Sequence, residues 1–578
     1  MSEPTRLPQP IILIRGFGQL DVSDDKQDAY QGFNEGTVYP YKKGENYIYE
    51  GFILRFLKSN WKYQDATNVV GYYGKQIAED PVLPRKLLNL EQMLNKGVTL
   101  SPQLKNLEEK NVIENFKRLQ SEKFFSGDKI VISPAMALHL LESVENVSQT
   151  IWVFRYYDLN DRTFKTYGRA LVRLIDFIRE LAHIHNAEKP KVNIIAHSMG
   201  GLLVREAIQR TYPEIYPEKE QPAKDYINKV VTLGTPHQGI SFQVMENWIG
   251  IAAKDEIKHF NPGFQKDATK PVSFLNFHQY FPTERLLTIV GTNYRSYHKP
   301  SMSFLNRLFS IEDEYGKTYN RSDGLVKQSY AQIPGVPRTF IHKSHSGIDS
   351  LVTSREAFEI ATRFFFGNLR TRLRFVRGKV LRGKDLFGKS EFFLGVCIKP
   401  RSVDFELFHQ SKEAENCYGP FSKTNPEYPD NNIDFRESNE ELAFNWADDN
   451  KLIWEGYFDT RSIIEDESIA EKDMVMRLDF YVGERDLLGI GFSDNVIFRK
   501  QYYIRALLPK DNRNIQLFLH KDERFANRDH GIPMEFNNGG WEFDVRGTGF
   551  EGTFKIEVDV VPEVGEPKLF SIEKRKFL

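Results

Sequence analysis

Short, fully apolar runs alternate with helical stripes along residues 11–367, and this alternation is what most constrains the fold. One stripe covers residues 167–182, and a later helix carries Leu202, Leu203 and Ile208 at helical spacing. Apolar runs of this length are typical of strands that are buried on both faces. Strands alternating with helices predict a mostly parallel sheet covered on both sides. The predicted strands are IILI at 11–14, IWVF at 151–154, VNII at 192–195, KVVTL at 229–233, LLTIV at 286–290 and TFIH at 339–342.

The parallel unit is expected to close with a helix that ends near Gly367. Thr353 is followed three residues later by Glu356, a spacing typical of the capping box at a helix start. Two long segments interrupt the alternation. Residues 19–149 carry an apolar helical stripe and predict an ordered helical insertion, whereas the stripe within residues 240–282 predicts a lid.

The hydrophobic pattern of the sequence changes after about residue 370, where helical stripes are replaced by short β-like runs. We therefore expect two domains, an α/β unit over residues 1–369 and an antiparallel β-sandwich over residues 370–578. The clearest of these runs are FFLGVCI at 392–398, RLDFYV at 477–482 and FKIEVDVV at 554–561.

Composition narrows the classes of function and the expected compartment. Acidic and basic residues nearly cancel, 79 against 78, which argues against nucleic acid as a partner. The two cysteines, Cys397 and Cys417, are too few for a disulfide-stapled secreted scaffold. The N-terminus has no apolar signal-peptide core, and the first apolar run is too short to span a bilayer. The expected location is the cytoplasm, with peripheral contact at a membrane surface and leaderless export left open.

The string NIIAHSMGG at 193–201 is the most informative local motif. A buried strand leads directly to Ser198 and then into a helix, with the small residues Ala196 and Gly200 on either side. Small neighbours allow the sharp turn that exposes a hydroxyl at the carboxyl end of a sheet. The string resembles the nucleophile elbow of α/β-hydrolase lipases and esterases, and the resemblance covers roughly residues 10–367. It implies an α/β-hydrolase fold with helical insertions and Ser198 as the nucleophile.

Two further strings match segments of the same family. RGFG at 15–18 resembles the oxyanion loop, with Arg15 where a histidine is common. The resemblance implies that the N–H groups of Phe17 and Met199 bind the negatively charged oxygen that forms during the reaction. VTLGTPHQG at 231–239 resembles the LGTPH segment that follows the next strand in many lipases.

The acid and the base of a catalytic triad are expected after the serine, in that order. RSDGLV at 321–326 resembles the acid segment of bacterial lipases and makes Asp323 the predicted acid. His345 follows the last predicted strand and is the predicted base, which would take the proton of Ser198 and return it to the leaving group. His342 is the alternative base and Asp158 the alternative acid.

The C-terminal part resembles a C2 domain. LRGKDLFGKSEFFLGV at 381–396 is similar to the opening of that family, with Glu391 in place of the usual second aspartate. The resemblance implies that Asp385, Glu391, Glu484 and Asp486 are the positions of a calcium site, because Ca²⁺ prefers carboxylate oxygens. A sandwich that binds no calcium is the alternative.

These patterns predict a serine hydrolase that cleaves carboxylic esters of a lipid, as a lipase or phospholipase does, without a cofactor for catalysis. Acyl transfer by the same triad is a close alternative, because an alcohol can replace water in resolving the acyl-enzyme. A lipid-binding protein without catalytic activity is the alternative from another class, and it predicts that Ser198 is dispensable.

Overall fold

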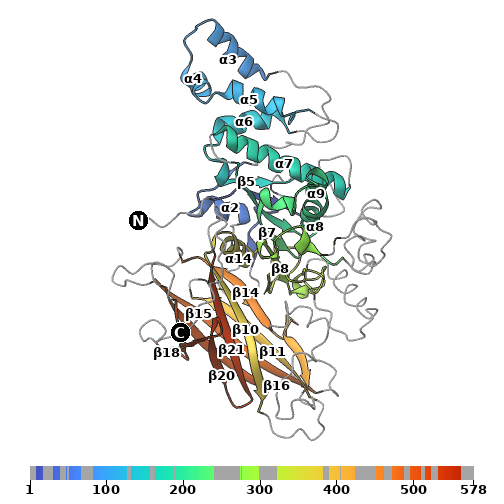
Figure 1. The fold of residues 1–578 in the computed structure, drawn as a ribbon, viewed down its shortest axis with the longest axis vertical. Helices are drawn as coiled ribbons and strands as arrows, with labels where there is room; N and C mark the ends of the chain where they lie inside the picture. The colour runs from blue at the N-terminus through green and yellow to red at the C-terminus, as the bar shows by residue number, and fades with distance from the viewer. Residues whose placement is uncertain are drawn as a thin grey trace.

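The computed structural model describes most of the chain, and Figure 1 shows it as three layers along the longest axis. Helices α3 to α6 lie at one end, a parallel sheet with its helices occupies the middle, and antiparallel sheets form the other end. The described residues are 8–16, 30, 32–38, 47–48, 51–66, 83–126, 132–156, 163–185, 189–239, 274, 276–297, 322–381, 390–401, 403, 405–414, 416–422, 451–460, 472–486, 495–508, 515–522 and 531–561.

The central sheet has seven strands in the order β4-β5-β1-β6-β7-β8-β9, and every neighbouring pair is parallel. The predicted apolar runs form six of these strands, and all their residues are buried. This confirms the expected α/β architecture. The strands are β1 (Ile11–Ile14), β4 (Gln64–Asp65), β5 (Thr150–Val153), β6 (Val192–His197), β7 (Ile227–Leu233), β8 (Leu286–Gly291) and β9 (Arg338–Ile341).

Helices pack against this sheet: α7 contacts β5 through the rings of Phe177 and Trp152, and α14 lies next to β7 (Figure 1). Helix α7 (Phe164–Ile184) buries the predicted apolar stripe and begins at Thr163, whose hydroxyl accepts from the N–H of Thr166. Helix α8 (Met199–Glu206) continues through a π-helical turn (Ala207–Thr211) into α9 (Tyr212–Ile215). None of the helices in these ranges is both long and apolar enough to cross a bilayer.

Helix α14 (Arg355–Phe366) begins one residue later than the capping-box prediction required. The N-cap is Ser354, whose hydroxyl accepts from the N–H of Ala357 at 3.1 Å. The hydroxyl of Thr353 instead accepts from the N–H of Ser350 in the preceding loop. The prediction of Thr353 as the cap was wrong because two adjacent hydroxyl residues compete, and the loop occupies the first of them.

The segment 19–149 supplies helices and also one strand of the central sheet. Helices α3 to α6 project from the sheet, and Phe124 at the end of this layer packs edge-on against Phe177 of α7. Strand β4 lies within the same segment and extends the sheet by pairing with β5. The helices are α2 (Phe52–Lys58), α3 (Arg85–Asn95), α4 (Pro102–Glu109), α5 (Val112–Ser121) and α6 (Pro134–Ser143), and a small hairpin pairs β2 (Thr37–Val38) with β3 (Tyr47–Ile48).

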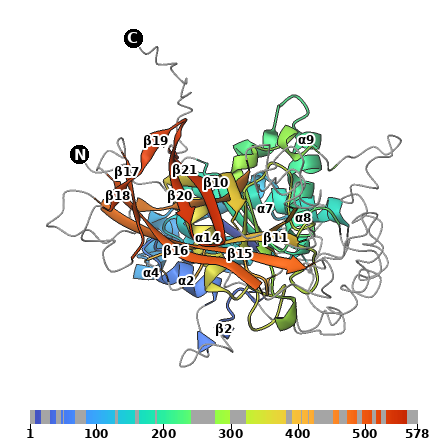
Figure 2. The same ribbon diagram turned by 90° about the horizontal axis from the view of Figure 1, so that it is seen from below.

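The C-terminal strands form two antiparallel sheets that pack face to face. Their orders are β14-β10-β21-β20-β19 and β12-β11-β15-β16-β17-β18, with β13 on β11. The ring of Phe480 on β15 lies 4.5 Å from that of Phe554 on β21, and Figure 2 shows β10, β20 and β21 crossing β15 and β16. The strands are β10 (Leu369–Val380), β11 (Ser390–Pro400), β12 (Phe408–His409), β13 (Tyr418–Ser422), β14 (Leu452–Phe458), β15 (Lys472–Asp486), β16 (Asn495–Leu508), β17 (Gln516–His520), β18 (Ile532–Pro533), β19 (Glu535–Asn537), β20 (Gly540–Arg546) and β21 (Phe550–Val560).

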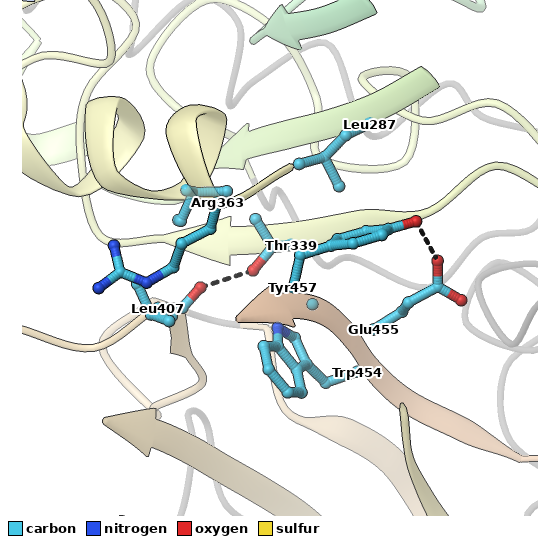
Figure 3. A pocket seen from close by; sticks show the side chains of 9 residues that line it. Leu287, Thr339, Arg363, Leu407, Trp454, Glu455 and Tyr457 are labelled. Atoms are coloured by element: carbon cyan, nitrogen blue, oxygen red, sulfur yellow. Dashed lines mark hydrogen bonds between the residues drawn. The ribbon is translucent and has the colours of Figure 1, made fainter. Parts of the chain in front are cut away.

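The sandwich packs directly against the α/β unit (Figure 3). Only residues 367–368 separate α14 from β10, and the rings of Phe364 and Tyr457 meet at 5.0 Å across the junction. The hydroxyl of Thr339 on β9 donates to the carbonyl of Leu407 at 2.7 Å. The cavity drawn in Figure 3 measures about 10 Å³ and can hold about one water molecule, so it is not a substrate site.

Candidate active site

Ser198 occupies the turn between β6 and α8, with φ 54° and ψ −129°. Few residues other than glycine adopt a positive φ, and such strain is frequent at functional sites. The turn is crowded, because a Cβ atom on Gly200 would lie 2.6 Å from the carbonyl oxygen of Ile14. A Cβ atom on Gly201 would lie 2.2 Å from the hydroxyl of Thr235. The two glycines after the serine therefore let the helix start close to β1 and to the loop after β7.

The three predicted triad side chains lie together. The Nε2 atom of His345 is 2.9 Å from the Oγ atom of Ser198, and its Nδ1 atom is 2.8 Å from the Oδ2 atom of Asp323. The side chains of His345 and Asp323 are each 1% exposed, and Ser198 is equally buried. Because the carboxylate can only accept from Nδ1, the Nε2 atom is left with a lone pair for the serine proton.

Asp323 is fixed by the backbone of its own turn. Its Oδ1 atom accepts from the N–H groups of Leu325 at 3.0 Å and Val326 at 2.8 Å. Its carbonyl oxygen accepts from the N–H of His345 at 2.8 Å. The carboxylate therefore has one oxygen for the turn and one for the imidazole, and a backbone hydrogen bond holds the two residues in register.

His197, directly before Ser198, contacts the loop that carries His345. Its Nε2 atom lies 2.9 Å from the carbonyl oxygen of His345, and the two imidazole rings are 4.8 Å apart. Burial lowers the pKa of His197 well below 6.5, and the nearby His345 and Arg15 lower it further. His197 is therefore a neutral hydrogen-bond donor to the loop that carries the base.

The proposed oxyanion loop approaches the nucleophile closely. A Cβ atom on Gly16 would lie 2.3 Å from the Cβ atom of Ser198, so only glycine fits there. Met199 is the first residue of α8, where N–H groups have no partner within the helix. Its N–H is thus left without an intrahelical partner beside Ser198, and Phe17, the other predicted oxyanion residue, lies outside the described residues.

A buried ion pair closes the base of the loop that carries His345, and sequence patterns gave no sign of it. The Nζ atom of Lys343 lies 2.6 Å from Asp349 and 3.3 Å from Glu356. The backbone carbonyl of Asp349 accepts from both the N–H and the hydroxyl of Ser344. The loop is therefore held at both of its ends.

Arg205 on α8 is a second residue that the sequence did not identify. Its Nη1 atom donates to the carbonyl of His237 at 2.6 Å, and its Nε atom donates to Gln209 at 2.8 Å. Burial lowers the pKa of Arg205 to about 9. The Nε2 atom of His237 lies 3.0 Å from the hydroxyl of Thr232. Arg205 thus fixes the segment 231–239 that resembles the LGTPH string.

The alternative base, His342, does not join this arrangement. His342 follows β9 directly, and its Nδ1 atom contacts the hydroxyl of Thr292 at 3.1 Å. Burial, with the nearby His409, lowers the pKa of His342 to about 4, and the two rings lie 5.3 Å apart. Asp158 and most of the predicted lid, residues 240–273, lie outside the described residues.

The predicted calcium ligands are only partly visible. Asp385 and the side chains of Glu391 and Asp486 fall outside the described residues. Glu484 is buried and its Oε2 atom accepts from the amide of Asn495 at 3.0 Å. Within the described ranges no three His, Cys, Asp or Glu side chains group as metal ligands.

Comparisons with known proteins found a match to one family model and to solved structures. Residues 135–260 match the family described as "Putative serine esterase (DUF676)". No curated protein matches the chain. Among solved structures, the Bacillus licheniformis lipase BlEst2 in mature form is similar at 18% identity over 37% of this chain and 78% of that one, with a TM-score of 0.25.

Phospholipase PlaB from Legionella pneumophila, in complex with thio-NAD, is similar at 11% identity over 59% of this chain and 82% of that one, with a TM-score of 0.26. These low scores carry no weight for substrate or ligand. The segment 135–260 contains β6, Ser198 and α8, the elements that build the nucleophile turn. Over this segment the chain is similar to serine esterases, and its parallel sheet has the architecture of an α/β hydrolase.

Proposed function

We propose that this protein hydrolyses carboxylic esters through Ser198, His345 and Asp323, with a lipid as the substrate. The observation that carries the proposal is the continuous chain of contacts from Ser198 Oγ to His345 at 2.9 Å and from His345 to Asp323 at 2.8 Å. All three side chains are buried, and Ser198 has a positive φ, a strained backbone conformation that is frequent at functional sites.

The reaction proceeds in two halves. The Oγ atom of Ser198 attacks the ester carbonyl while its proton passes to Nε2 of His345, and Asp323 stabilises the resulting imidazolium. The negative oxygen of the tetrahedral intermediate accepts from the N–H of Met199. The intermediate collapses as His345 protonates the leaving alcohol, and Ser198 retains the acyl group. Water then attacks the acyl-enzyme with His345 as the base, and the acid is released.

Three features support a lipid as the substrate. One is Ile348, three residues after His345, which is 63% exposed. The adjacent sandwich and the apolar stripe within residues 240–282 of the sequence point the same way. We infer that the protein makes peripheral contact with a lipid surface.

Labelling with a fluorophosphonate probe tests the triad. The full chain should be labelled at Ser198, and hydrolysis of p-nitrophenyl esters should increase from short to medium acyl chains. Ser198→Ala should lose both signals, while Ser121→Ala, at the exposed end of α5, should keep them. Labelling elsewhere, or activity in Ser198→Ala, would overturn the proposal. Product analysis with an added alcohol distinguishes hydrolysis from acyl transfer.

Calcium in the sandwich is a separate proposal that catalysis does not require. Titration calorimetry of the full chain with Ca²⁺ tests it, with Glu484→Gln as the variant. The proposal fails if heat is absent at millimolar ion, which is the weak end of the affinity range for protein calcium sites.

A further inference from the structure

Strand β10 presents a row of arginines on the outer face of the sandwich. Side chains alternate along a strand, so Leu369 and Leu373 are buried toward the opposite sheet. Arg370, Arg372 and Arg374 lie on the other face, with side chains that are 26%, 22% and 12% exposed. Three cations on one strand face repel one another unless anions lie between them.

These arginines line a cavity of about 160 Å³ between the sandwich and the start of β9. That volume far exceeds the roughly 10–15 Å³ that a single water molecule needs, so the cavity can hold a polyatomic ion. Its walls are residues 335–338, residues 452–455 of β14, and the three arginines of β10. Glu455, whose contact with Tyr457 is drawn in Figure 3, is the only carboxylate among these wall residues.

A fourth arginine, Arg338, reaches the cavity from the α/β unit and is only 7% exposed. Its Nη2 atom donates to the hydroxyl of Tyr418 at 3.3 Å, but its Nε atom has no hydrogen-bond partner within the described ranges. No described carboxylate forms an ion pair with it. Burying a guanidinium without an anion costs free energy, so an anion bound in the cavity would stabilise Arg338.

The carboxylates near the cavity are already shared. Glu455 accepts from Arg370 at 2.7 Å. Glu557 on β21 is contacted by Arg374 at 2.9 Å and by Arg372 at 3.3 Å. Arg372 also pairs with Asp559, and Lys555 reaches Glu557 at 3.0 Å.

The cluster therefore carries two more positive than negative charges. Four cations share three carboxylates, and the buried Arg338, the fifth cation, pairs with none of them. The cations are Arg338, Arg370, Arg372, Arg374 and Lys555, and the carboxylates are Glu455, Glu557 and Asp559.

We propose that this cavity binds the phosphate group of a phosphate monoester. A phosphate monoester carries a charge of about −1.5 to −2 at neutral pH, which matches the excess charge of the cluster. Guanidinium groups bind phosphate oxygens in a bidentate manner, and the cavity is lined by four arginines. The site is independent of ester hydrolysis, because Arg338 begins β9 whereas His345 follows the opposite end of that strand.

The thermal midpoint of the full chain tests the site, with inorganic phosphate as the probe and chloride at equal ionic strength as the reference. Phosphate should raise the midpoint of the parent chain and of Ser198→Ala equally, because a ligand stabilises the state that binds it. Arg338→Gln and the more peripheral Arg374→Gln should each weaken phosphate binding at least tenfold. Arg377→Gln, on the same strand but outside this cavity, should bind as the parent does.

The two sources of a phosphate monoester are separated by a second measurement. Glycerol 3-phosphate serves as the soluble probe, and vesicles of phosphatidylcholine with or without phosphatidic acid serve as the lipid probe. Cosedimentation with vesicles that requires phosphatidic acid and is lost in Arg374→Gln assigns a lipid headgroup as the ligand. A thermal midpoint that rises with glycerol 3-phosphate, without cosedimentation with phosphatidic acid vesicles, assigns a soluble ester. The proposal is overturned if phosphate leaves the parent's midpoint unchanged, or if Arg374→Gln responds as the parent does.

Discussion

The side chain of His197 donates to the backbone carbonyl of His345, so the residue before the proposed nucleophile holds the proposed base in place. A carbonyl can only accept, and the contact therefore requires the proton of His197 to be on Nε2. Its lowered pKa keeps the ring neutral at physiological pH. His197 acts on the reaction through the position of His345 and is a positioning residue.

His197→Ala should lower kcat about fivefold and leave KM nearly unchanged. The loss of one buried hydrogen bond costs about 1 kcal/mol, and about 1.4 kcal/mol corresponds to a factor of ten in rate. Steady-state kinetics on a soluble ester measure the effect. His183→Ala, on the exposed side of α7, is the control. An unchanged kcat in His197→Ala would show that the loop needs no support from this ring.

Gly16→Ala should slow fluorophosphonate labelling of Ser198 by about a hundredfold. The added methyl group would lie 2.3 Å from the Cβ atom of Ser198, and a displacement of about 1 Å at a reacting group costs about that factor. Ser121→Ala, at the exposed end of α5, is the control. Equal labelling rates in the two variants would contradict the close approach of this loop to the serine.

Asp323→Asn should reduce kcat about 10⁴-fold while leaving the fold intact. The asparagine carbonyl should take the Oδ1 position, where two backbone N–H groups require an acceptor. The amide NH₂ then faces Nδ1 of His345, which forces the imidazole proton onto Nε2 and prevents it from accepting the serine proton. Asp225→Asn, on the surface, serves as the control. A loss below tenfold would exclude Asp323 as the acid.

Asp176→Asn should stabilise the protein at neutral pH but not in acid. Burial raises the pKa of Asp176 on α7 from 3.8 to about 6, against the attraction of Arg179 and Arg173. The folded state thus keeps this proton to a higher pH than the unfolded state, and its contribution to stability is lost as pH rises from about 4 to about 6. Each pKa unit corresponds to about 1.36 kcal/mol.

Urea unfolding of Asp176→Asn and the parent across that pH range measures this effect. The variant's advantage in free energy of unfolding should be near zero at pH 4, grow between pH 4 and pH 6, and level off at about 1–3 kcal/mol. A difference that is constant with pH would show that the carboxylate is not desolvated in the folded state.

The apolar strands could be predicted because a strand buried on both faces appears in the sequence as a run of mostly apolar residues. Strand β6 is apolar at most of its positions and runs into the small residues around Ser198. Strand β4, with the sequence Gln64–Asp65, has no such run, since its place at the sheet edge depends on pairing with β5 and not on hydrophobicity.

The triad could be predicted because each member follows a strand in a recognisable string. The residues that hold the triad in place could not be predicted from the sequence. Lys343 and Arg205 are buried, and nothing in their local sequence distinguishes them from surface cations. Their partners, Asp349 and the carbonyl of His237, come from other turns, so only the tertiary fold brings them together.

The two-residue connection at 367–368 keeps the sandwich close to the α/β unit that carries the candidate triad. Strand β9, which delivers the base at its far end, leans on the sandwich through Thr339 and through the rings of Phe340 and Phe408. The sandwich therefore supports the strand that leads to His345, and any other C-terminal domain would have to supply the same contacts to β9.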